Sequence, residues 1–95
     1  MATGSDKRAE LRYFRDVVGH EVDAVVLRKG KPWLAVEVKS DDRPLDAGLR
    51  YLLERVSIPH ALQVSLHGTT HARLPGPRGT DPRVVPAATF LAHLP

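Results

Sequence analysis

Two runs of β-branched residues, separated by a short turn, constrain this chain more than any other feature. The runs are EVDAVVLR at residues 21–28 and WLAVEVK at residues 33–39, and the turn between them runs from Lys29 to Pro32 and contains Gly30. Valine-rich runs of this length, bounded by turn residues, are typical of β-strands. Two such runs joined by three or four residues predict an antiparallel β-hairpin. We therefore expect a sheet at the centre of the fold.

The residues after this hairpin predict a helix and then a strand. Ser40, Asp41 and Asp42 are helix-capping residue types, and Pro44 suits the first turn of a helix. An apolar stripe of helical period follows, and it consists of Leu45, Leu49, Leu52, Leu53 and Val56. Pro59 forbids further helix. A strand that follows a crossover helix is expected to lie parallel to the strand before that helix.

The strand predicted after the helix alternates apolar and polar residues. Leu62, Val64 and Leu66 are expected to face the core, whereas Gln63, Ser65 and His67 are expected to face solvent. A strand is also predicted over residues 11–16, a loop over 68–82, a short strand over 83–85 and a closing helix over 86–94. Residues 1–8 are expected to form a flexible leader, and residues 9–95 a single domain. The predicted class is α/β, with a mixed sheet of antiparallel hairpins plus a parallel strand.

Composition excludes several classes of site. Among 95 residues there is no cysteine, so neither disulfides nor thiolate metal sites are expected. The five histidines lack the compact spacing of a zinc site. No apolar run approaches the roughly 18 residues of a membrane span, and the N-terminus lacks the apolar region of a signal peptide. We therefore expect a soluble cytoplasmic protein with no membrane partner. The net charge of +3 permits a nucleic-acid partner without requiring one.

The hairpin brings two carboxylates and a lysine together. Residues two apart on a strand share a face, so Glu37 and Lys39 are expected to project together. If the hairpin is centred on Gly30, Arg28 lies opposite Pro32, Asp23 lies opposite Glu37, and Lys39 is diagonal to Asp23. Opposed like charges destabilise a sheet, and a divalent cation such as Mg²⁺ would remove this conflict. Two carboxylates, a metal ion and a lysine are what phosphodiester hydrolysis needs. A slip of one residue would turn one carboxylate away.

These residues also carry a resemblance to known families. Asp23, followed after 13 residues by Glu37-Val38-Lys39, resembles the motif of the PD-(D/E)XK nuclease superfamily. The stretch from Tyr13 to Leu66, with the closing residues 85–91, resembles the C-terminal domain of unknown function found on many prokaryotic AAA-type ATPases. The resemblance covers most of the chain after residue 8, and it implies a restriction-endonuclease-like fold.

The resemblance also implies roles for individual residues. Asp23 and Glu37 would bind Mg²⁺ or Mn²⁺, the Val38 carbonyl would be a further ligand, and Lys39 would act as catalytic base or as electrostatic stabiliser. The chain would then be a metal-dependent nuclease acting on DNA or RNA, and an accessory domain of an ATPase system. The superfamily also carries an acidic residue on a helix before the first strand. Here Glu10 is the nearest upstream acid, and the segment before it is barely long enough for a helix.

Two other interpretations stay open at this point. The domain could be a catalytically inactive nuclease-fold module that binds a protein or nucleic-acid partner. It could also be a homodimer in which a second copy supplies the missing helix. Glu21 is a secondary candidate for the acidic cluster, and Gln63 could line the site, although a solvent-facing role is the expectation. The basic residues of the hairpin region are expected to form a solvated edge rather than a phosphate site; they are Arg12, Arg15, Arg28, Lys29 and Lys31.

Overall fold

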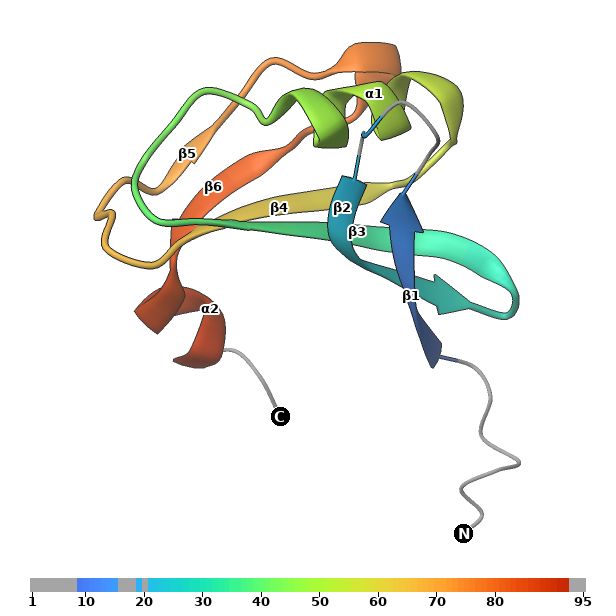
Figure 1. Cartoon of the computed structure of the whole chain (residues 1–95), viewed down its shortest axis with the longest axis horizontal. Coiled ribbons are helices and arrows are strands. Elements are labelled where there is room, and N and C mark those ends of the chain that lie inside the picture. Colours follow the sequence, from blue (N-terminus) through green and yellow to red (C-terminus); the bar gives the residue numbers. More distant parts are fainter. Residues whose placement is uncertain (1–8, 16–18, 20, 93–95) are drawn as a thin grey trace, which may run out of the picture.

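The fold is a single mixed sheet with one helix on each face. The computed structural model describes residues 9–15, 19 and 21–92. The sheet has six strands in the order β1-β2-β3-β4-β6-β5, with α1 above it and α2 below it in the view of Figure 1. The strands are β1 (Ala9–Arg15), β2 (Glu21–Arg28), β3 (Lys31–Lys39), β4 (His60–Ser65), β5 (Ala72–Arg73) and β6 (Arg83–Pro86). The helices are α1 (Ala47–Arg55), the 3₁₀ turn η2 (Pro77–Gly79) and α2 (Ala87–Ala92).

The strand directions confirm the predicted α/β class. β1, β2 and β3 form an antiparallel meander, and β4 joins β3 in parallel after the crossover through α1. β6 is parallel to β4, and β5 closes the far edge antiparallel to β6. The predicted loop over residues 68–82 therefore contains a short edge strand and a 3₁₀ turn. The predicted leader, residues 1–8, lies outside the described residues, as do Asp16 and Leu94.

The β2–β3 turn is tighter than the sequence suggested. Lys29 and Gly30 both have positive φ, at 53° and 77°, which is the backbone of the two-residue turns that match strand twist. Arg28 consequently pairs with Lys31, so the expected pairing of Arg28 with Pro32 is wrong. A register shift after Val26 then restores the expected alignment, and Ala24 pairs with Val36. The pairs next to the turn thus follow one register, and the pairs from Val26 to Ala24 follow the register that was expected.

Helix α1 starts later than predicted. Asp46 is its N-cap, and the Asp46 side chain accepts a hydrogen bond from the Leu49 N–H at 3.0 Å. The expected caps at residues 40–42 instead hold the loop after β3 against the loop after β4. The Ser40 carbonyl accepts from the His67 N–H at 2.7 Å, and the Asp42 carboxylate accepts from the Thr69 N–H at 3.1 Å. Pro44 lies before the helix rather than in its first turn, because these contacts hold residues 40–42 in a loop against the loop after β4.

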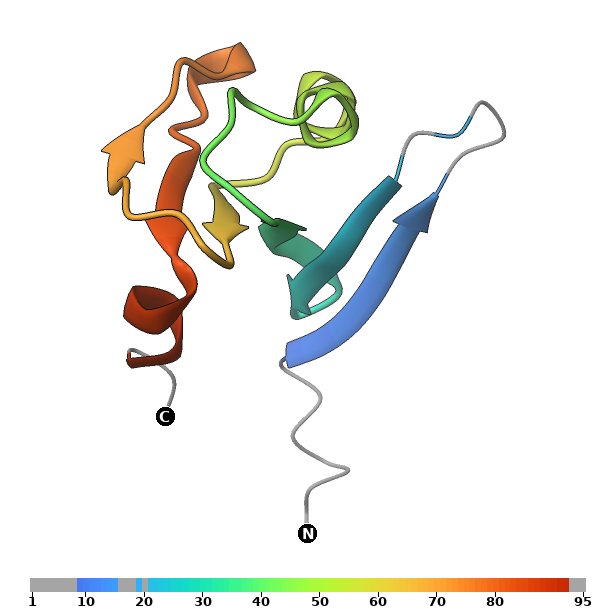
Figure 2. The same cartoon turned by 60° about the vertical axis from the view of Figure 1, so that its left-hand side comes forward.

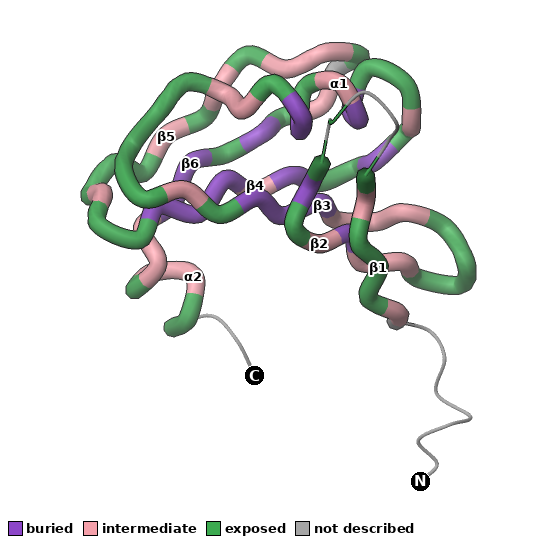
Figure 3. The backbone as a smooth tube through the Cα atoms, viewed as in Figure 1, coloured by how far each residue is buried: buried purple, intermediate pink, exposed green. Residues whose placement is uncertain are grey.

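Apolar residues cover both faces of the sheet. On the α1 face, Leu49, Leu52 and Leu53 pack against Val22, Val25, Ala35 and Ala61. On the α2 face, Val36, Val64 and Val85 are buried, and Phe90 of α2 packs against them. The buried residues concentrate along β3, β4 and β6, as Figure 3 shows. The sheet is therefore packed on both of its faces.

One strand prediction is wrong for a topological reason. Gln63 and Ser65 were expected on a solvent-facing side of β4, but both are 0% exposed. β4 is an interior strand with parallel neighbours on both sides, and parallel strands are normally covered on both faces. The segment from residue 41 to α1 lies over this face of β4, as Figure 2 shows. Alternation alone cannot distinguish a solvated face from one that buries polar groups.

No helix in the part of the chain that the structure describes is long and apolar enough to cross a membrane.

Candidate functional site

A pocket of about 340 Å³ lies where the carboxyl end of β3 meets the start of α1. Strand β3 supplies Glu37 and Lys39 to it, and α1 supplies its capping residue, Asp46. The complete lining consists of Gly19, Glu21, Glu37, Lys39, Asp46, Ala47 and Gly48. The pocket therefore joins a strand end to a helix N-terminus.

Strand alternation places Glu37 and Lys39 on the same face of β3 as the core residue Ala35, below α1. The Glu37 side chain is 11% exposed and that of Lys39 is 27% exposed. Their charged ends lie 3.4 Å apart, between Glu37 Oε2 and Lys39 Nζ. The predicted convergence of these two side chains is therefore present in the structure, at the floor of the pocket.

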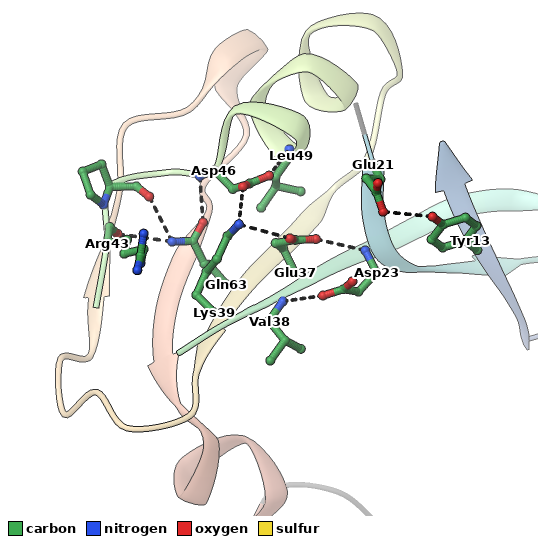
Figure 4. Close-up of polar contacts among 11 residues, drawn as sticks. Tyr13, Glu21, Asp23, Glu37, Val38, Lys39, Arg43, Asp46, Leu49 and Gln63 are labelled. Atoms are coloured by element: carbon green, nitrogen blue, oxygen red, sulfur yellow. Dashed lines mark hydrogen bonds and ion pairs between the residues drawn. The ribbon is translucent and has the colours of Figure 1, made fainter. Parts of the chain in front are cut away.

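Asp46 completes the cluster, although the sequence analysis did not select it. Lys39 Nζ lies 2.5 Å from Asp46 Oδ1, and Asp46 Oδ2 accepts the Leu49 N–H at 3.0 Å. One carboxylate thus caps α1 and pairs with the lysine of β3. Figure 4 shows the lysine between the two carboxylates. The available sequence signal was the cap itself, because an Asp three residues before Leu49 is a favoured N-cap.

Gln63 supports this cluster from below without lining the pocket. Its Oε1 accepts the Asp46 N–H at 2.8 Å, and its Nε2 donates to the carbonyls of Arg43 and Pro44 at 3.2 and 3.0 Å. A fully buried amide thereby satisfies three backbone groups of the segment that leads into α1. Gln63 is a positioning residue, and its role explains why a polar side chain is buried in β4.

Asp23 and Glu37 interact through the backbone. Glu37 Oε1 accepts the Asp23 N–H at 3.0 Å, and Asp23 Oδ2 accepts the Val38 N–H at 2.9 Å. Each carboxylate therefore bonds to the opposite strand where the regular pairing of β2 with β3 has ended. β2 also carries an extra residue relative to β1 between Val22 and Val25. A bulge of this kind re-aims the side chains within it, and Asp23 is one of them.

The remaining candidates lie around the pocket rather than in it. Asp23 and Val38 are not among its lining residues, and the Val38 side chain belongs to the opposite face of the sheet. Glu21 lines the pocket, but its carboxylate accepts from the Tyr13 hydroxyl at 2.9 Å and lies 3.7 Å from Arg15. Glu10 is in strand β1, not in a helix, and pairs with Arg12 at 2.9 Å.

The electrostatic environment differs for each member of the cluster. Burial raises the pKa of Glu37 above its ordinary value, and the neighbouring charges of Asp23 and Asp46 add to this effect. The hydrogen bond to Asp46 raises the pKa of Lys39, although burial opposes it. Burial also acts to raise the pKa of Asp46, but the hydrogen bonds from Lys39 and from the Leu49 N–H outweigh it, and the net pKa is lowered. At neutral pH, Lys39 and Asp46 are therefore an ion pair.

Two carboxylates of the pocket, those of Glu37 and Asp46, are oxygen donors of the type that a hard divalent cation takes. Glu37 Oε2 and Asp46 Oδ1 already share one cation, the Lys39 ammonium, while the other oxygen of each carboxylate holds a backbone N–H. Within the described ranges, no group of three or more His, Asp or Glu side chains is arranged to hold a metal ion. An ion at this place would therefore take its other ligands from water or from a phosphate, which is the usual environment of Mg²⁺.

Comparison with known proteins gives one match. A family model described as "Domain of unknown function (DUF4143)" matches residues 1–80. No curated protein and no solved structure gives a significant match. The matched range includes the whole pocket and the strands and helix that form it.

Proposed function

Because the chain belongs to the DUF4143 family of domains of unknown function, we propose a function from the site itself: metal-dependent hydrolysis of nucleic-acid phosphodiesters. The observation that carries the proposal is the convergence of Glu37, Lys39 and Asp46 on one pocket. Two carboxylates beside a cationic lysine are the groups that bind a divalent ion and a phosphate together. The family match is also compatible with an accessory domain of an ATPase system, as the resemblance of the sequence implied.

Each residue has a role that follows from its environment. Glu37 and Asp46 would hold Mg²⁺ or Mn²⁺. Asp23 would be a third carboxylate close to the ion. A bound divalent ion would stabilise charge developing on the scissile phosphate and would lower the pKa of a bound water. Because its pKa is raised, Lys39 remains protonated near neutral pH and suits charge stabilisation of the phosphate oxygens better than proton abstraction.

The raised pKa of Glu37 supports a functional site. Burying a carboxylate near two other acids costs stability, and such groups concentrate where chemistry requires them. The desolvated environment also strengthens the attraction between the carboxylate and a cation.

The direct test is cleavage of plasmid and single-stranded DNA with Mn²⁺ or Mg²⁺. We expect Glu37→Gln to lower the rate by about 10²-fold or more, the scale typical of losing a charge-stabilising group. Glu54→Gln is the matched control, because Glu54 is an exposed glutamate on α1 outside the pocket. Equal rates for Glu37→Gln and wild type would overturn the assignment of chemistry to this cluster.

A second candidate function rests on a different observation. Asp23 and Glu37 both hold backbone N–H groups, and Lys39 joins the sheet to α1. In an inactive nuclease-fold module this network would serve only to hold the fold together while another surface bound a protein or nucleic acid. Mn²⁺ binding measured by electron paramagnetic resonance distinguishes the two. Binding that Glu37→Gln abolishes and Glu54→Gln retains supports the first function, whereas its absence in wild type supports the second.

A further inference from the structure

The edge of the sheet at β1 carries an inference that does not depend on the proposed function. β1 is the first strand in the sheet order and pairs only with β2 within the described residues. It is seven residues long, and no second strand of the described residues pairs with its outer side. The Leu11 carbonyl accepts a long hydrogen bond from the Arg12 guanidinium, at 3.5 Å. Leu11 is 69% exposed and Tyr13 is 54% exposed on this strand. An edge that carries exposed apolar residues is a template for pairing with another strand.

The occupant of this edge follows from the order of charges along it. Glu10 and Arg12 flank Leu11 and share one face, whereas Leu11 and Tyr13 share the other. Two identical strands that pair antiparallel are related by a two-fold axis. The side chains of directly opposed residues point to the same face of the sheet. The axis must therefore pass beside one residue, which lies opposite its own counterpart in the second copy. Each possible register can then be named by the residue at its centre, and the registers can be compared by the charges that they place opposite each other.

A register centred on Leu11 matches charges of opposite sign. Glu10 faces Arg12 of the second copy on both sides of the axis, Leu11 faces Leu11, and Tyr13 faces Ala9. Registers centred on Glu10 or Arg12 place like charges directly opposite each other, which is destabilising. A register centred on Tyr13 leaves Arg12 facing Phe14 and Arg15 facing Leu11, without an ionic pair. Among the registers centred on residues 10–13, the one centred on Leu11 is therefore the one that places opposite charges face to face.

We propose that β1 pairs with β1 of a second copy of this chain, antiparallel and centred on Leu11, and so joins the two sheets into one. The two-fold axis is perpendicular to the joined sheet, so both copies of α1 lie on the same face. Both pockets then lie on the same face of the joined sheet. The Glu10–Arg12 ion pair within one copy, at 2.9 Å, becomes part of a four-charge cluster across the axis.

Disulfide trapping tests the register directly, because the chain contains no cysteine of its own. Facing residues of an antiparallel pair have Cα atoms about 4.5–5.5 Å apart, within the range that a disulfide bridges. Leu11→Cys should therefore crosslink to a covalent dimer under mild oxidation. Tyr13→Cys is the matched control, since it is exposed on the same face but would lie about 13 Å from its counterpart at 3.3 Å per residue. Crosslinking of both variants at the same rate would overturn the register.

A charge exchange separates pairing between copies from pairing within one copy. Glu10→Lys and Arg12→Glu each place like charges opposite each other in a homodimer and also remove the ion pair within the chain. In a mixture of the two variants, the introduced lysine of one copy faces the introduced glutamate of the other. The retained Arg12 of the first copy likewise faces the retained Glu10 of the second, so opposite charges pair only between copies. We expect sedimentation to show weaker self-association of each variant and at least partial recovery in the mixture.

Two results would contradict pairing of β1 with β1 of a second copy. If wild type sediments as a monomer up to several hundred micromolar and Leu11→Cys does not crosslink faster than Tyr13→Cys, a second copy does not occupy this edge. If the mixture associates no more than the separate variants, the charges do not set the register. Circular dichroism of each variant confirms that it is folded, because the substituted side chains lie outside the buried core.

Discussion

The ammonium of Lys39 lies 2.5 Å from the carboxylate of Asp46, so the last residue of β3 is joined to the residue that caps α1. This contact closes the loop of residues 40–45 and fixes the start of the helix over the end of the strand. It also places a cation between two acids, Glu37 and Asp46. The same contact therefore serves stability and defines the charge distribution of the pocket.

Substitution of Asp46 should separate its two structural contributions. Asp46→Asn retains a good N-cap but loses the ion pair with Lys39, whereas Asp46→Ala loses both. We expect the alanine variant to have the lower free energy of unfolding, by about 1 kcal/mol, the usual value of a cap. Urea denaturation at neutral pH measures the free energy of unfolding of both variants. Equal stability of the two variants would show that the cap contributes nothing.

The stabilising effect of the Asp46 charge should disappear in acid. The pKa of this carboxyl is lowered in the folded state, so its contribution is present above the ordinary pKa and is lost as pH falls through the folded pKa. The difference in stability between wild type and Asp46→Asn should consequently shrink as pH is reduced from about 7 to about 3. A stability difference between wild type and Asp46→Asn that stays constant over this pH range would contradict the stabilising role of the Asp46 charge.

Glu37 should show the opposite pH dependence. Its pKa is raised in the folded state above 4.5, so the folded protein binds the proton more tightly than the unfolded chain. Stability is then lost as pH rises from the ordinary pKa through the folded pKa. Glu37→Gln keeps an acceptor for the Asp23 N–H and lacks this loss, so its stability relative to wild type should increase between about pH 4 and about pH 7. Urea midpoints of both proteins, with Glu54→Gln as control, provide the measurement.

Gly48 should not tolerate a methyl group. A Cβ at this position would overlap the Glu21 carbonyl oxygen, because the first turn of α1 packs directly on the backbone of β2. Alanine in a helix normally gains about 1 kcal/mol over glycine, but overpacking of this kind costs about 1–3 kcal/mol. We expect Gly48→Ala to be destabilising in urea denaturation, whereas Arg50→Ala on the exposed side of α1 should be nearly neutral. A stabilised Gly48→Ala would show that α1 can move away from β2.

Replacement of Gln63 should affect the pocket from a distance. Gln63→Leu would leave the Asp46 N–H and the Arg43 and Pro44 carbonyls without their partner. Each buried unsatisfied group costs about 1–3 kcal/mol, so we expect a loss of stability of at least about 2 kcal/mol. Gln63→Glu keeps an acceptor for the Asp46 N–H but loses the donor, and should be less destabilised at low pH, where its carboxyl is protonated. Urea midpoints at about pH 4 and about pH 7 check both statements.

Local sequence determined much of the sheet. Two valine-rich runs around Gly30 specified β2 and β3, and the alternation in β3 placed Glu37 and Lys39 on one face. These features depend on neighbouring residues only, because side-chain alternation and turn chemistry are properties of short segments. The leucine spacing also identified α1, although the prediction that Pro44 lies in its first turn placed the start at least three residues too early. The fold class followed from the order of these segments.

The tertiary structure alone decided which polar residues belong to the site. Asp46 joined the cluster because the crossover helix returns over the strand it left, and Gln63 is buried because β4 has neighbours on both sides. The sequence could not show either, since each depends on contacts between residues 7 to 20 positions apart. Asp23 was likewise placed by a bulge relative to β1 rather than by simple pairing. Local sequence patterns determine helices and strands, whereas the burial of a polar side chain depends on how those helices and strands pack together.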